Sequence, residues 1–323
     1  MRNARTCGAP AVTAIALAIL ASSAGVSAAV IHVDAAATGA HDGTSWADAY
    51  PELQSALAVA QADDEIWVAA GTYRPDYDPA ADAHTGDRAA TFQLISGVGL
   101  YGGFQGNAHP TGGETQRDQR DPEANQVVLS GDLLANDGPE AVNREDNCHH
   151  VAVGDGTDAN TVLDGFTITG GNANDADGVE LRGGGLFIAS GSPTILDCRF
   201  EGNQAATFGG GVFVQNGRPT LNNCVFIENT AGKEGGGMYN LRSDPDLLDC
   251  SFRDNLAGVS GGGMGNQESS PALTECLFAA NLARGWYNDK GGGGMNNEKS
   301  HPTLTGCTFL RNVAQAERHE TGS

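Results

Sequence analysis

Acidic side chains that could hold a divalent cation gather before the most regular part of the chain. Asp155, Asp158 and Asp164 are followed by Asp175 and Asp177, which lie in a turn. Calcium takes oxygen ligands of this kind, although aspartates in loops also cap turns. With calcium on a uronate sugar, a nearby basic side chain can remove the proton next to the carboxylate and start an elimination. The sequence therefore predicts these five aspartates as candidate calcium ligands, and no other cofactor.

The base for such a reaction is harder to find in the sequence. Arginines are scattered, and none pairs obviously with the acidic cluster. His149 and His150 are adjacent, so in a strand they would point to opposite faces, and we expect one buried and one exposed. Trp286 and Tyr287 could stack on a sugar ring or pack against the neighbouring coil. These two are the candidate binding residues for a glycan or a partner, and we identify no catalytic set.

An internal repeat determines which elements carry these residues. Each copy opens on a glycine triplet and contains a proline, a cysteine, a phenylalanine and an asparagine at fixed places. The phenylalanines lie 26, 26, 26 and 31 residues apart. The three main columns are Phe200, Phe226, Phe252, Phe278 and Phe309; Cys198, Cys224, Cys250, Cys276 and Cys307; and Asn203, Asn229, Asn255, Asn281 and Asn312. Glycine and proline divide each copy into strand-length segments without a helical period, which predicts a stack of β-coils.

Stacked coils place equivalent side chains about 4.8 Å apart, the spacing of neighbouring strands. The sequence therefore predicts an all-β fold, a right-handed parallel β-helix, in which phenylalanine lies on phenylalanine and the asparagine amides form a ladder. We interpret the cysteine column as free thiols that fill the core, because parallel side chains suit a disulfide poorly. No C-x-x-C spacing is present, so we expect no zinc site.

The remaining chain divides around this solenoid. Residues 1–29 have the basic start, apolar stretch and small-residue cleavage site of a secretory signal peptide. Residues 30–90 resemble an N-terminal cap of strand, helix and strand, in which a helix over Ser45–Gln61 covers the open end of the coils. The other segments are irregular coils with loops at 91–182, five regular coils at 183–317, and a truncated or open end at 318–323.

Composition limits the location and the partners of the mature chain. Without Arg2 and Arg5, 16 basic residues face 40 acidic residues, which gives a net charge of −24. Such a chain repels nucleic acid and anionic membranes. The apolar stretch of the signal peptide is short for a membrane span, and the sequence contains no other candidate span. We therefore expect a secreted protein whose partner is a polysaccharide or a cell-surface molecule.

Two parts of the chain resemble known families. The glycine triplets followed by Leu, Val or Met, together with the F-x-x-N signals, resemble the repeats of chlamydial polymorphic outer membrane proteins over about 183–317. The segments around Val33, Ile66–Tyr73 and Leu129–Asp132 resemble secreted bacterial β-helix proteins of the pectin-lyase-like superfamily. These resemblances imply an extracellular or outer-membrane location in a bacterium, but no reaction. The Asn-Thr-Asp and Gly-His-Gly motifs of the polygalacturonase-like enzymes in that superfamily are absent.

These observations favour a non-enzymatic protein that acts in adhesion, in carbohydrate binding or as a structural scaffold. The alternative is a calcium-dependent polysaccharide lyase acting on uronate polymers. A groove lined by several acids and an arginine would favour the lyase, whereas a flat polar face would favour the adhesin. No sixth glycine triplet opens near Arg318, so we expect the C-terminal end to be continued or capped by further chain.

Overall fold

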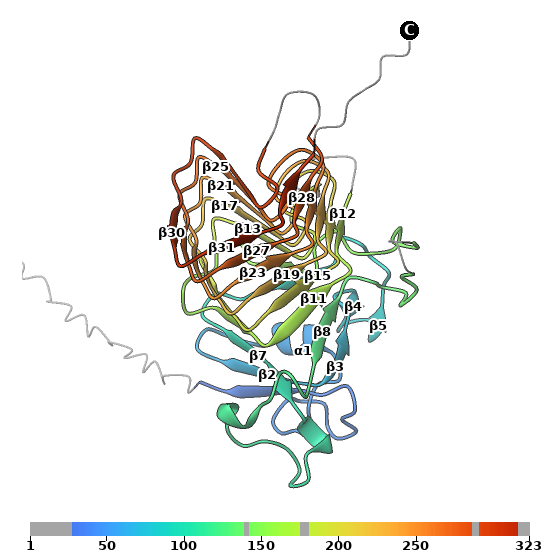
Figure 1. Ribbon diagram of the computed structural model, residues 1–323. Coiled ribbons are helices and arrows are strands. Elements are labelled where there is room, and N and C mark those ends of the chain that lie inside the picture. Colours follow the sequence, from blue (N-terminus) through green and yellow to red (C-terminus); the bar gives the residue numbers. More distant parts are fainter. Residues whose placement is uncertain (1–27, 139–141, 175–180, 286–290, 316–323) are drawn as a thin grey trace, which may run out of the picture.

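The computed structural model describes residues 28–138, 142–174, 181–285 and 291–315. Within these residues the chain winds in coils along one axis (Figure 1). Each regular coil has four short strands, and each strand pairs in parallel with its equivalents in the adjacent coils. The predicted fold class, an all-β parallel β-helix, is confirmed.

The described strands form four parallel sheets and one hairpin. The nine-stranded sheet contains, in spatial order, β1 (Val30–Val33), β2 (Glu65–Ala69), β7 (Gly99–Phe104), β10 (Val162–Asp164), β14 (Thr194–Leu196), β18 (Thr220–Asn222), β22 (Asp246–Leu248), β26 (Ala272–Thr274) and β30 (Thr303–Thr305). The eight-stranded sheet contains β3 (Gly71–Tyr73), β8 (Val127–Ser130), β11 (Phe166–Thr169), β15 (Arg199–Glu201), β19 (Val225–Ile227), β23 (Ser251–Arg253), β27 (Leu277–Ala279) and β31 (Thr308–Leu310).

The other two parallel sheets complete each coil. The six-stranded sheet contains β12 (Asn172–Ala173), β16 (Gln204–Ala205), β20 (Thr230–Ala231), β24 (Leu256–Ala257), β28 (Leu282–Ala283) and β32 (Val313–Ala314). The seven-stranded sheet contains β29 (Met295–Glu298), β25 (Met264–Gln267), β21 (Met238–Leu241), β17 (Val212–Gln215), β13 (Leu186–Ala189), β9 (Ala152–Val153) and β6 (Phe92–Gln93). The antiparallel hairpin consists of β4 (Tyr77–Asp78) and β5 (Ala83–His84).

The phenylalanine column lies in a single file inside the solenoid. Phe200 faces Phe226 across the pair β15–β19, and the same register brings Phe252, Phe278 and Phe309 into line. Neighbouring rings stack with centroids 5.0, 4.4, 4.6 and 4.7 Å apart. The first four rings are fully buried, whereas Phe309, in the last described coil, is 45% exposed. Each buried ring stabilises the stack by roughly 1.5–3 kcal/mol.

The asparagine column forms a ladder at the corner that follows the eight-stranded sheet. Asn229 Nδ2 donates to Asn255 Oδ1 at 3.0 Å and to Phe200 O at 2.8 Å. Asn229 Oδ1 accepts the backbone N–H and the Nδ2 of Asn203, both at 3.1 Å. The same bonds recur one coil later between Asn255 and Asn281. Every polar atom of these fully buried amides therefore has a partner, and the ladder holds adjacent coils in register.

The cysteine column lies at the corner between the nine-stranded and eight-stranded sheets, and its thiols are free. Cys250 Sγ donates to Leu248 O at 3.3 Å. Burial raises the pKa of Cys198 to about 12, and the hydrogen bond with Cys224 raises the pKa of Cys250. Cys198 and Cys250 are therefore protonated, and the column fills the core with small apolar groups.

The glycine triplets form the tight corner between the six-stranded and seven-stranded sheets. Gly209 has a φ of 64°, in the left-handed region that favours glycine. A Cβ on Gly210 would lie 2.4 Å from Thr230 O of the next coil. The backbones of successive coils thus approach one another at this corner too closely for any side chain.

The helix at the N-terminal cap is much shorter than the predicted Ser45–Gln61. Only Leu53–Leu57 form α1, which buries Leu53 and Leu57 against the core of the first coil. Tyr50 runs beside β1 instead, because its N–H donates to His32 O at 3.0 Å and its carbonyl accepts the Asp34 N–H at 2.9 Å. This pairing keeps the backbone extended and delays the start of the helix, so the predicted range was wrong.

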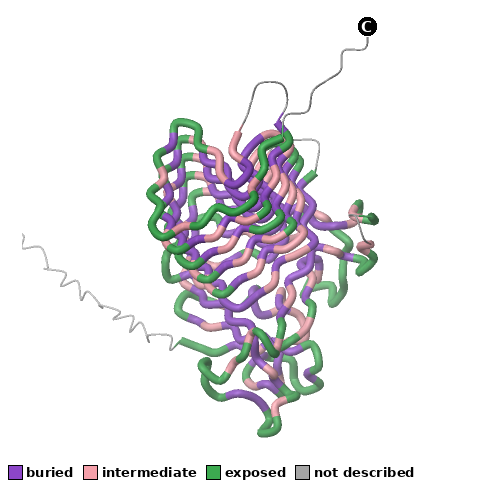
Figure 2. The backbone as a smooth tube through the Cα atoms, in the orientation of Figure 1, coloured by how far each residue is buried: buried purple, intermediate pink, exposed green. Residues whose placement is uncertain are grey.

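Two long insertions leave the coils next to the eight-stranded sheet. Residues 105–126 connect β7 to β8 and contain the short helices η1 (Gly106–Ala108) and η2 (Arg117–Gln119). The second insertion, residues 131–147, follows β8, and its residues 139–141 lie outside the described part. Figure 1 shows the two insertions on different sides of this sheet. Figure 2 shows that the coil interior is buried, while the insertions are largely exposed.

Candidate functional site

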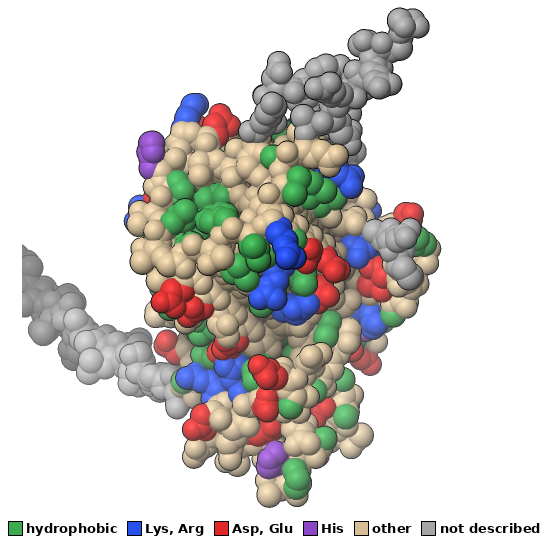
Figure 3. Space-filling view, in the orientation of Figure 1, with side chains coloured by type: hydrophobic (Ala, Val, Ile, Leu, Met, Phe, Trp, Pro, Cys, Tyr) green, Lys and Arg blue, Asp and Glu red, His purple; other side chains and the backbone are tan. Residues whose placement is uncertain are grey.

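A groove of about 650 Å³ lies where the first insertion meets the eight-stranded sheet. Asp118, Arg120 and Glu123 line it from the insertion, and Asp197 and Arg199 line it from the coils. Figure 3 shows basic and acidic side chains close together on this face of the molecule. The groove therefore combines both signs of charge beside a flat sheet.

Two buried carboxylates hold the insertion 105–126 in place. Asp34, 4% exposed, accepts the backbone N–H of Asn107 at 2.8 Å. Glu114, 3% exposed, accepts the backbone N–H of Gln105 at 2.6 Å. Trp46 Nε1 donates to the Glu114 carbonyl at 2.8 Å. Buried charges that accept backbone hydrogen bonds fix a loop firmly, so this wall of the groove is formed before any ligand arrives.

Arg120 connects the insertion to the next coil through an ion pair. Its Nη2 lies 2.5 Å from Asp164 Oδ2, and its Nη1 donates to Gly102 O at 2.9 Å. The Arg120 and Asp164 side chains are only 14% and 7% exposed. Burial raises the pKa of Asp164, while the hydrogen bond and the charge of Arg120 act in the opposite direction. Arg120 thus serves to position the wall.

Arg117 lies on the same insertion but is more exposed. Its guanidinium carbon lies 4.4 Å from the centre of the Tyr101 ring, and its Nη1 lies 2.7 Å from Glu65 Oε1. Burial raises the pKa of the Tyr101 phenol. Arg117 therefore covers the outer face of the nine-stranded sheet beside the groove.

The opposite wall of the groove is formed by side chains of successive coils. Asn223 Nδ2 donates to Asp197 Oδ1 at 2.7 Å, so the two corner residues are linked across one coil step. Arg199 Nε lies 2.5 Å from Glu201 Oε2 within β15. The Arg199 and Glu201 side chains are 40% and 38% exposed, so solvent reaches this pair. Because surface pairs of this kind are weak, the Arg199 guanidinium remains available to a ligand.

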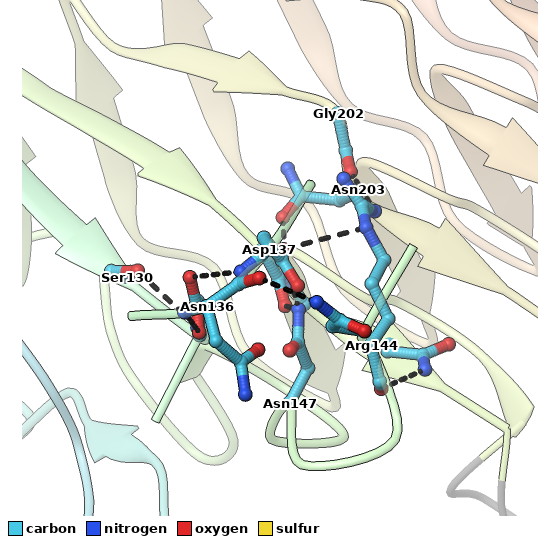
Figure 4. Close-up of polar contacts among 12 residues, drawn as sticks. Ser130, Asn136, Asp137, Arg144, Asn147, Gly202 and Asn203 are labelled. Carbon is cyan, nitrogen blue, oxygen red and sulfur yellow. Dashed lines mark hydrogen bonds and ion pairs between the residues drawn. The ribbon is translucent and has the colours of Figure 1, made fainter. Parts of the chain in front are cut away.

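The second insertion is anchored to the following coil (Figure 4). Arg144 Nη1 donates to Gly202 O at 2.6 Å, and its Nε lies 3.4 Å from Asp137 Oδ2. Asn147 Nδ2 donates to Asp137 Oδ2 at 2.9 Å and to Gly170 O at 2.6 Å. Burial raises the pKa of Asp137. The eight-stranded sheet is therefore bounded by one fixed insertion at each of its two corners.

The free polar groups of the groove include both donors and acceptors. The carboxylates of Asp118 and Glu123 and the amide of Gln126 have no hydrogen-bond partner among the described residues. Sugar hydroxyl groups both donate and accept, so they match such a mixed set. The one aromatic residue in the lining, Phe166, is buried and offers no stacking surface. Recognition in this groove would therefore rest on hydrogen bonds.

Three of the five predicted calcium ligands have separate roles. Asp155 accepts a backbone N–H of β13, Asp158 caps its own turn, and Asp164 pairs with Arg120. Among the described residues no group of three or more His, Cys, Asp or Glu side chains could hold a metal ion. The structure therefore does not gather these three carboxylates around one point.

The other predicted site residues lie outside the part of the chain that the structure describes. These are the calcium candidates Asp175 and Asp177 and the binding candidates Trp286 and Tyr287. A calcium-binding role for Asp175 and Asp177 and the aromatic binding site therefore stay predictions.

The prediction for the adjacent histidines was wrong. His149 and His150 are both buried, at 7% and 9% exposure. His150 Nδ1 lies 3.0 Å from Gly183 O, and its ring stacks on Phe187 with centroids 5.0 Å apart. The two residues lie in a bend between β8 and β9, so the alternation of faces in a strand does not apply to them.

Arg120 is the important residue that sequence reasoning missed. It lies 44 positions before Asp164, in a polar segment without any repeat. The available signal was the length of the segment between two predicted coils, because insertions in solenoids often form the binding face.

Comparison with known proteins identifies the family. Residues 143–309 match the family described as "Right handed beta helix region". The chain belongs to the right-handed β-helix family. This match also gives the handedness of the coils, as predicted. No curated protein sequence matches the chain.

Two solved structures are similar to this β-helix chain. The "Crystal structure of pectate lyase Pel9A" shares 14% identity and a TM-score of 0.48, covering 91% of this chain and 80% of that one. A structure entitled "Rhamnogalacturonan lyase" shares 12% identity and a TM-score of 0.37, covering 80% of this chain and 70% of that one. In the described residues, no helix has the length and apolar character needed to cross a membrane.

Proposed function

We propose that this β-helix protein binds a neutral polysaccharide in the groove beside the eight-stranded sheet, without cleaving it. The proposal rests on one observation: a preformed groove carries unpaired carboxylate and amide groups from Asp118, Glu123 and Gln126. These groups match the hydroxyl groups of a sugar chain. The signal-peptide-like start and the resemblance to surface proteins support action outside the cell, in adhesion or as a scaffold.

Charge favours a neutral ligand over a uronate polymer. Three acids, Asp118, Glu123 and Asp197, face two arginines, Arg120 and Arg199, and Arg120 is already neutralised by Asp164. The whole chain carries a net charge of −22. An anionic polymer would therefore meet repulsion unless a cation bridged it to the protein.

The test is a binding series with matched polysaccharides. Neutral glucans, mannans and galactans are titrated against the protein beside pectate and alginate, with calorimetry as the readout. The double variant Asp118→Ala/Glu123→Ala should lose about tenfold in affinity, the effect expected when one or two hydrogen bonds are removed. Asp246→Ala, an exposed carboxylate on the nine-stranded sheet, is the matched control. Binding that is equal in both variants, or absent for every neutral polymer, would contradict the proposal.

A second candidate is a calcium-dependent lyase acting on uronate polymers. The observation in its favour is the groove itself, because it contains several acids together with arginine, the combination that such a reaction requires. The unsaturated product of that elimination absorbs at roughly 235 nm. Pectate, alginate and glycosaminoglycans are incubated with the protein in calcium and, as a control, in a chelator. Absorbance that rises only with calcium would replace the binding proposal, and a flat trace with all polymers would remove the lyase.

A further inference from the structure

A second groove lies at the N-terminal cap, far along the chain from the regular coils. It is an open groove of about 550 Å³, lined by residues of α1, β4 and β6. Figure 1 shows α1 near β4, and the two elements are in contact. Leu57, Ala58 and Ile95 supply an apolar surface within the groove. The volume lies within the range of about 300–1,000 Å³ that is typical of small-molecule sites.

The two glutamines in this groove present only acceptors. Gln54 Nε2 donates to the carbonyls of Pro75 and Thr91. Gln93 Nε2 donates to Val153 O at 3.3 Å and to the carbonyl of its own neighbour at 3.1 Å. Both amide nitrogens are thus engaged within the protein. The groups left for a ligand are the two Oε1 atoms, which accept hydrogen bonds.

The charged groups of the lining are all carboxylates. Asp76 is 2% exposed and is held by His84 Nδ1 at 2.8 Å and by the Gly86 N–H at 2.9 Å. Asp78 and Asp87 are exposed, and each uses one oxygen to cap its own turn. Among the described lining residues there is no Lys, Arg or His. A ligand therefore meets negative charge and acceptors but no cation.

The Tyr77 side chain adds another hydrogen-bond acceptor to this groove. Its hydroxyl donates to Asp82 Oδ1 at 2.6 Å, so the phenol oxygen can only accept from a ligand. The hydrogen bond with Asp82 raises the pKa of Tyr77 to about 12, so the phenol stays un-ionised even in mildly alkaline solution. The face of a neutral phenol ring also attracts cations.

We propose that this groove binds an aliphatic primary amine in its ammonium form. An ammonium group has three N–H donors and no acceptor, which matches a lining whose free groups are acceptors. Its charge matches Asp78 and Asp87, and its methylene stem matches the apolar surface of Leu57 and Ile95. The site is separate from the polysaccharide groove and does not depend on it.

The experiment compares three ligands of one length and differing charge. n-Butylammonium, n-butanol and butyrate are titrated against the full chain and followed by NMR or calorimetry. Only the ammonium should bind, and binding should weaken as salt is added. The variant Asp78→Asn/Asp87→Asn should weaken it by about tenfold, because asparagine keeps each turn cap but removes the charge. Asp158→Asn, which alters the cap of a distant turn in the same way, is the matched control.

The outcome decides the proposal and the source of the amine. Thermal melting first shows that all variants are folded. Equal binding of butanol and butylammonium, no binding of butylammonium, or unchanged affinity in the double variant would overturn the proposal. Putrescine and Nα-acetyl-lysine amide are then compared. Tighter binding of putrescine assigns the site to a free polyamine, and tighter binding of the lysine derivative assigns it to a lysine of a protein partner.

Discussion

Replacement of Arg120 by leucine tests whether an ion pair holds the wall of the polysaccharide groove. The variant loses the contacts from Nη2 to Asp164 and from Nη1 to Gly102 O. The buried Asp164 is then left without its counter-ion. Loss of one partner from a buried pair costs about 3–5 kcal/mol. For a chain of 323 residues the unfolding entropy is about 0.7 kcal/mol/K, so the melting temperature should fall by about 4–7 °C.

The stability lost in Arg120→Leu should depend on pH, and the direction of this dependence follows from the pKa of Asp164. Burial already raises the pKa of Asp164, and Arg120 lowers it, so the variant should raise this pKa further. A carboxyl group whose pKa is higher in the folded protein than in the unfolded chain stabilises the fold at low pH. That contribution is lost as the pH rises through the folded pKa. The variant should therefore lie closest to the parent at about pH 4, near the ordinary pKa of an aspartate, and fall behind toward about pH 7.

Calorimetric melts at the two pH values measure the stability lost in Arg120→Leu. Two further variants show whether this loss comes from the buried ion pair. Arg117→Leu removes an arginine of the same insertion whose side chain is 47% exposed, and it should cost at most about 1 kcal/mol. Arg120→Leu/Asp164→Leu removes both charges and should recover much of the stability. Equal losses of stability in Arg120→Leu and Arg117→Leu would refute the reasoning. So would a loss of stability in Arg120→Leu that does not change with pH.

Three further predictions concern the solenoid itself. Asn255→Ala removes four ladder hydrogen bonds and leaves buried groups unpaired, so urea titration should show a loss of at least about 3 kcal/mol. Asn222→Ala, on the outer face, should change little and serves as its control. Gly236→Ala would place a Cβ 2.4 Å from a carbonyl oxygen of the next coil and should cost about 1–3 kcal/mol in thermal melts; an unchanged melt would contradict the close approach. Ellman's reagent should reach only Cys307 among the six described cysteines of the native protein, and rapid labelling of Cys250 would contradict its burial.

The regular coils could be predicted because one residue type recurs at each structural position. Phe226 and Asn229 have the same neighbours above and below as their equivalents, so spacing alone determines their register. Parallel stacking then places the side chains without any knowledge of distant segments. The same reasoning predicted the buried thiol file, in which Cys224 and Cys250 are equivalent.

The candidate site could not be predicted in this way. Its wall depends on single contacts between segments far apart in the chain, such as Asp34 with Asn107 and Arg120 with Asp164. No repeated spacing in the sequence indicates which residues form such pairs. The prediction of a helix over Ser45–Gln61 was wrong for a related reason. The pairing of Tyr50 with β1 outweighed the helical pattern of the neighbouring residues.

The 31-residue step between Phe278 and Phe309 leaves their ring stacking intact, at 4.7 Å, although the other steps are 26 residues. The extra length lies in the sequence between β28 and β29, and the strands on both sides of it keep their pairing with the adjacent coil. It follows that corners of this molecule are places for grafting: a foreign segment inserted there changes what the scaffold presents to its surroundings but not the scaffold. New recognition surfaces can therefore be built, by evolution or by an engineer, without redesigning the interior.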